Sequence, residues 1–69
     1  MLNNDHPNKL YTVGDTVTFR YNNSLKKGVI FIVDKNGTFE LPGITSYDIM
    51  VESENTLYKH ITCDFIVSE

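Results

Sequence analysis

The prediction of the fold starts from the stretch Gly28-Val29-Ile30-Phe31-Ile32-Val33-Asp34. Every other apolar segment of the chain is shorter or more amphipathic. The five central residues of the stretch are all β-branched or aromatic, and a glycine and an aspartate bound them. Such side chains suit a pleated surface, and the run is too short for a stand-alone helix. We therefore predict a central strand over 28–34, buried on much of both faces, with the core assembled around it.

Two further segments alternate between apolar and polar residues, which is typical of half-buried antiparallel strands. Thr16–Tyr21 is the first and Ser46–Glu52 the second. A fourth strand is predicted over Leu57–Ile61, with its register left open because both of its faces carry a polar residue. The predicted inward sets are Val17, Phe19 and Tyr21 on the first strand and Tyr47, Ile49 and Val51 on the second; Phe19, Ile30, Ile49 and Val51 are expected to be nearly fully buried.

Short polar segments separate these strands. Asn22-Asn23-Ser24 is predicted to be a turn, and Asn36-Gly37 is the strongest hairpin signal in the chain, so that Thr38–Leu41 would pair back briefly. Thr62-Cys63-Asp64 is read as a short helical turn, and Phe65-Ile66-Val67 as a closing strand. Residues 1–10 are predicted to be a flexible tail and 11–69 the folded domain.

Length and composition allow one small domain. The chain has 69 residues, a net charge of −3 and a single cysteine, so no internal disulfide supports the fold. The acidic balance argues against a protein that coats nucleic acid non-specifically, although a local basic patch is compatible with it. No signal peptide and no run of membrane-spanning length is recognisable, which predicts a cytoplasmic protein.

Five short strands joined by tight turns predict a small all-β barrel, since closing the sheet removes exposed edges. Four segments carry a resemblance: Val13-Gly14-Asp15-Thr16-Val17, Gly28-Val29-Ile30, Tyr47-Asp48-Ile49, and Ile61 with Phe65-Ile66. Together they resemble the SH3-like small barrels of bacteria and their phages, which include KOW-type and Tudor-like modules. The resemblance covers roughly residues 13–67. It implies a five-stranded SH3-like barrel with a short helical turn before the last strand.

No enzymatic constellation is apparent. His60 and Cys63 are spaced so that an imidazole could meet a thiol, but nothing in the sequence supplies a third, orienting residue. The same pair lacks two further ligands for a zinc site, because His6 lies in the predicted tail. The sequence therefore predicts a non-enzymatic protein with no cofactor and no metal.

Aromatic residues suggest one kind of ligand site. Tudor-like barrels hold a methylated cation in a cage of aromatic rings and an acid, through cation–π attraction. Core packing is the commoner use of such side chains. The residues considered for a cage are Tyr21, Phe31, Phe39, Tyr47 and Tyr58, with Asp34, Asp48 and Glu52.

The sequence suggests two alternative interaction surfaces. The preferred hypothesis is a protein partner, or self-association, through an apolar strand face that includes Val29 and Phe31, together with Tyr21. The alternative is nucleic-acid binding through a local basic patch, in which Tyr21 would stack on a base. The residues predicted for this patch are Arg20, Lys26, Lys27 and Tyr21, with Lys35 and Lys59 as further bases that could gather on the same side.

Overall fold

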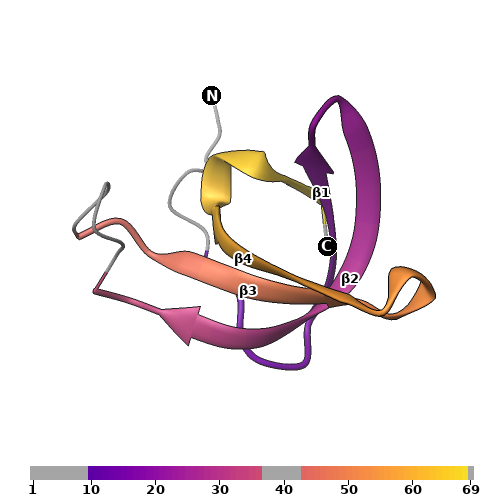
Figure 1. Ribbon diagram of the computed structural model, residues 1–69. Helices are drawn as coiled ribbons and strands as arrows, with labels where there is room; N and C mark the ends of the chain where they lie inside the picture. The colour runs from indigo at the N-terminus through magenta and orange to yellow at the C-terminus, as the bar shows by residue number, and fades with distance from the viewer. Residues whose placement is uncertain (1–9, 37–42, 69) are drawn as a thin grey trace.

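A computed structural model describes residues 10–36 and 43–68, and these form five antiparallel strands in one sheet (Figure 1). The sheet order is β4-β3-β2-β1-β5. The all-β prediction is therefore confirmed, and so is the short helical turn before the last strand. The strands are β1 (Thr16–Tyr21), β2 (Ser24–Asp34), β3 (Ser46–Val51), β4 (Thr56–Thr62) and β5 (Ile66–Ser68), with 3₁₀ turns η2 (Glu52–Glu54) and η3 (Cys63–Phe65).

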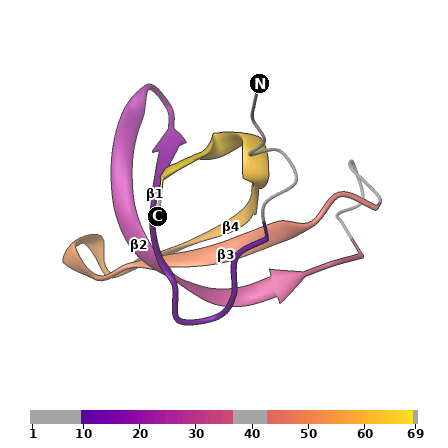
Figure 2. The same ribbon diagram turned by 180° about the vertical axis from the view of Figure 1, so that it is seen from behind.

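β2 joins the two halves of the sheet. Its first half pairs with β1, from Ser24 opposite Tyr21 to Val29 opposite Thr16. Its second half pairs with β3, from Val29 opposite Met50 to Asp34 opposite Ser46. Val29 belongs to both pairings, with Thr16 on one side and Met50 on the other, and the strand bends there. Figures 1 and 2 show the β1–β2 hairpin standing across β3 and β4. The predicted strand over 28–34 is thus the second part of a longer one that begins at Ser24.

The turn between β1 and β2 is a two-residue hairpin. Asn22 and Asn23 both have positive φ, 49° and 66°, while the flanking Tyr21 and Ser24 are paired. Two consecutive left-handed residues match the right-handed twist of the flanking strands, and asparagine tolerates this conformation better than most residues. The predicted turn at 22–24 is confirmed, with Ser24 as the first residue of β2.

The core lies between the two halves of the sheet. All four residues predicted to be nearly fully buried are at most 3% exposed. Tyr11 covers one end of this core, because its ring meets Tyr47 edge to face and its backbone N–H donates to the Tyr47 hydroxyl at 3.1 Å. The core cluster comprises Tyr11, Val17, Phe19, Ile30, Tyr47, Ile49, Val51, Ile61 and Ile66.

A close approach of β2 to β3 explains Gly28. A Cβ at this position would lie 2.5 Å from the Met50 carbonyl oxygen and 2.7 Å from Ile49 Cγ2. Both distances are shorter than van der Waals contact, so a side chain here would push the strands apart. Glycine thus allows β3 to pack tightly where β2 bends.

The prediction that 28–34 is buried on much of both faces is wrong after Ile30. Ile30 lies opposite Ile49 and Ile32 opposite Asp48, so Phe31 is an extra residue that forms a β-bulge. Ile30 is fully buried, whereas Phe31 and Ile32 are 48% and 50% exposed. Val33 packs against the core again, so this part of β2 contributes Ile30 and Val33 to the core while Phe31 and Ile32 face solvent.

Some predictions fall outside the described residues. The tail at 1–9 and the Gly37–Leu41 part of the predicted hairpin are among them. At the described base of this connection, the Gly43 N–H donates to the Asn36 carbonyl at 3.0 Å, and the Asn36 N–H donates to Asp34 Oδ1 at 2.9 Å.

Candidate binding pocket

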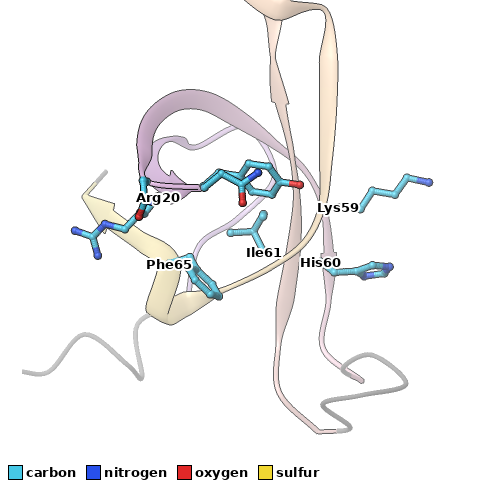
Figure 3. Close-up of a pocket in the computed structure, with 8 residues that line it drawn as sticks. Arg20, Lys59, His60, Ile61 and Phe65 are labelled. Carbon is cyan, nitrogen blue, oxygen red and sulfur yellow. The ribbon is translucent and has the colours of Figure 1, made fainter.

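A pocket with a volume of about 480 Å³ opens at the tip of the β1–β2 hairpin, beside β4 and η3. Four parts of the chain line the pocket: the end of β1, the hairpin turn, the middle of β4, and η3. Figure 3 shows Arg20 on one side of it, Lys59 and His60 on the other, and Ile61 and Phe65 between them. The lining residues are Arg20, Tyr21, Asn22, Asn23, Lys59, His60, Ile61 and Phe65.

A β-bulge in β4 presents Lys59 and His60. Tyr47 pairs with Ile61 and Ile49 pairs with Tyr58, so these two residues of β4 face the single Asp48 of β3. His60 has a φ of 63°, which is unusual for a residue with a side chain. Its backbone N–H donates to Asp48 Oδ1 at 3.1 Å. Asp48 thus holds the strained residue of the bulge through its backbone, and strained residues of this kind are found at binding sites more often than elsewhere.

The charge of the pocket is opposite to that of the chain. Arg20, Lys59 and the imidazole of His60 contribute to the lining, and none of the described residues that line it is acidic. Acids outnumber bases nine to six in the whole chain. Because potentials at a cleft depend on the charges that line it, this region can attract an anion although the net charge is negative.

Two half-exposed aromatic rings complete the lining. Phe65 of η3 is 47% exposed and Tyr21 is 39% exposed. The Tyr58 ring packs edge to face against the Tyr21 ring, with ring centroids 4.7 Å apart, and restricts its movement. Tyr58 in turn packs edge to face on the buried Phe19, with centroids 5.5 Å apart. Tyr21 was expected to point into the core with Val17 and Phe19; at the end of the hairpin it lies instead at the edge of the core.

A hydrogen-bonded cluster beside the pocket occupies Lys26. Its Nζ lies 2.7 Å from Glu54 Oε2 and 5.6 Å from the centre of the Tyr58 ring, and the Tyr58 hydroxyl donates to Glu54 Oε1. The hydrogen bonds from Lys26 and then from Tyr58 lower the pKa of Glu54. The same bonds to Glu54 raise the pKa of Lys26 and of Tyr58. The cluster joins residues of β2, η2 and β4.

The structure divides the predicted basic patch. Arg20 and Tyr21 line the pocket, while Lys26 is held by Glu54. Lys27 pairs with Thr18, so it projects from the same face of the hairpin as Arg20 but does not line the pocket. The predicted patch did not include five of the lining residues, namely Asn22, Asn23, His60, Ile61 and Phe65. One sequence signal could have indicated His60. The polar residues on both faces of 57–61 are consistent with a bulge, which places two consecutive side chains on the outside of the strand.

The residues predicted for a protein partner do not form one surface. Tyr21 pairs with Ser24, and Phe31 lies further along β2 beyond the bend at Val29, which is itself partly buried. The aromatic cage that was considered, for which core packing was the preferred alternative, is not assembled by the described residues. Tyr47 is 1% exposed, the Tyr58 ring lies beside Lys26, and Phe39 lies outside the described residues.

His60 and Cys63 have different surroundings. His60 lines the pocket, whereas Cys63 packs against the core cluster and is not part of the lining. Within residues 10–36 and 43–68, no group of three or more His, Cys, Asp or Glu side chains is placed to hold a metal ion. The same part of the chain contains no helix that is long and apolar enough to cross a membrane.

No protein-family model matches the chain, and no curated protein or solved structure shows significant similarity to it. The interpretation of the pocket therefore depends on its own geometry and chemistry.

Proposed function

We propose that this protein is a non-enzymatic module that binds nucleic acid through the pocket. The observation that carries the proposal is the lining: two bases and a histidine flank exposed aromatic rings, without an acid among the described lining residues. Phosphate neutralisation by Arg and Lys provides most of the affinity in such complexes, and aromatic rings provide stacking for bases. Because acids outnumber bases in the chain as a whole, phosphates would be repelled elsewhere on the surface, and binding would be limited to the pocket.

We also propose that the sheet is an SH3-like small barrel, of the bacterial or phage kind that the sequence resembles. Three observations support this architecture: β5 returns to pair with β1, β2 bends at Val29, and one core lies between the two halves. A closed sheet would also protect strand edges that a small open sheet leaves exposed.

A salt titration of oligonucleotide binding tests the proposed function. We expect weak binding at low ionic strength, with a Kd of about 10⁻⁶ to 10⁻⁴ M and a log–log salt slope of about −2 to −3 if three phosphates are contacted. Arg20→Gln should reduce the steepness of this slope. Lys35→Gln is the matched control, because Lys35 is exposed and does not line the pocket. Absence of binding to both single- and double-stranded oligonucleotides would refute the proposal.

A protein contact is the second candidate function. The β2 bulge favours it by leaving Phe31 and Ile32 both about half exposed at consecutive positions. Binding of a protein, or of a second copy of the chain, through these side chains would vary little with salt. It would also be weakened more by Phe31→Ser than by Arg20→Gln, which distinguishes it from binding at the pocket.

A further inference from the structure

We propose that the pocket accepts one unpaired nucleobase of a single-stranded nucleic acid. The phosphates on the two sides of that nucleotide would contact Arg20 and Lys59. This inference rests on the nucleic-acid binding proposed above and names the class of nucleic acid that the same site takes.

The aromatic rings provide the surface for the base. Phe65 and Tyr21 belong to different elements, η3 and β1, and both line the pocket with about half or less of their surface exposed. The packing of Tyr58 against Tyr21 restricts that ring before any ligand binds. Stacking on rings that are already restricted loses less side-chain entropy, and it accepts any base, because every base has a π-face.

The charged side chains lie on two opposite sides of the pocket. In Figure 3 the Arg20 side chain extends to one side of Ile61 and Phe65, and the Lys59 and His60 side chains extend to the other. A strand that crosses the pocket would therefore meet a cation before and after the nucleotide whose base is inserted. Cations on a single side would instead favour a ligand with one terminal anionic group.

The base faces that these rings would need are not free in a duplex. Bases in a duplex are stacked on both faces and paired at their edges, so they cannot stack on Tyr21 or Phe65 without being extruded. Asn22 and Asn23 supply amide groups at the turn, and amides both donate and accept hydrogen bonds, as base edges do. Both asparagines have the positive φ values of a two-residue hairpin turn, so the turn geometry sets the position of these amides.

Three labelled probes test the inference on the unaltered chain by fluorescence anisotropy at low salt. They are a short thymidine oligonucleotide, an abasic strand of the same length and charge, and a blunt duplex of matched length. We expect the thymidine strand to bind about 5- to 150-fold more tightly than the abasic strand, which is the range that stacking of one base provides. The duplex should bind more weakly than the thymidine strand.

Phe65→Leu provides the second arm, with Phe31→Leu as its control because Phe31 is equally exposed but lies outside the pocket. We expect Phe65→Leu to weaken thymidine binding by about five-fold or more and to leave abasic binding unchanged. Equal binding of all three probes, or equal effects of the two Phe variants, would overturn base insertion and leave nucleic-acid binding standing. Failure of every probe to bind would instead remove the proposed function itself.

Discussion

At the scale of single residues, two isoleucines differ in burial and therefore provide a test of where the core lies. Ile49 is fully buried between the two halves of the sheet, whereas Ile32 is 50% exposed after the β2 bulge. We expect Ile49→Ala to lower the free energy of unfolding by about 2–5 kcal/mol, through lost burial and the cavity left behind. This is a large part of the total stability of a small domain, which is about 5–15 kcal/mol.

Ile32→Ala is the matched control, because the same atoms are removed from a half-exposed position. We expect it to change the free energy of unfolding by no more than about 1 kcal/mol. Chemical denaturation of both variants, followed by circular dichroism, measures the difference. Similar losses for the two substitutions would mean that the bulge does not separate the residues as described.

At the scale of an element, the β4 bulge combines backbone strain with a contact from the neighbouring strand. A residue with a side chain in the left-handed region is strained by about 1–2 kcal/mol, and glycine is not. We expect His60→Gly to be more stable than the parent by about 0.5–1 kcal/mol, because the backbone hydrogen bond to Asp48 remains. The same variant should bind oligonucleotides more weakly, since it removes the imidazole from the pocket.

Lys59→Gly controls for the general effect of glycine in a strand. Lys59 is the other residue of the bulge and has no positive φ, so glycine there should lower stability by about 0.5–1 kcal/mol. Thermal melts of the two variants therefore should move in opposite directions. Destabilisation by both substitutions would argue against strain at His60.

At the scale of the whole molecule, the Lys26–Glu54–Tyr58 cluster connects both halves of the sheet and predicts a pH dependence of stability. The pKa of Glu54 is lowered from its ordinary value of 4.5, so its contribution is present above about pH 4.5 and is lost as the pH falls through the lowered pKa. The pKa of Tyr58 is raised from 10.0 and that of Lys26 from 10.5. Their contributions are present below these values and are lost as the pH rises further.

Glu54→Gln should therefore reduce the dependence of the melting temperature on pH at both the acidic and the alkaline end. Glu52→Gln is the control, because Glu52 is an exposed acid in the same 3₁₀ turn. The differences will be modest, since exposed ion pairs contribute little to stability and are screened by salt. Identical pH profiles for Glu54→Gln and the parent would show that the cluster does not stabilise the fold.

The positions of β1 and β3 and most of the residues they contribute to the core could be predicted from the amino-acid pattern alone. β1 coincides with the predicted Thr16–Tyr21, and β3 differs from its predicted range by one residue. The alternation of apolar and polar side chains is a local property with a period of two, so it can be read without knowledge of neighbouring strands. Arg20 and Tyr21 of the pocket could be selected in the same way, from charge and ring type next to a predicted turn.

The bulges and most of the pocket lining could be identified only once the pairing of the strands was known. Asp48 pairs with Ile32, next to the extra residue of β2, and it also faces the two bulged residues of β4, so these positions are set by pairing between strands. Lys26 and Glu54 are 28 residues apart, so their pairing could not be read from either segment alone. A bulge shifts the register by one residue, and each shift reverses which side chains face outward, so Ile32, Lys59 and His60 were placed by their strand partners rather than by their own alternation.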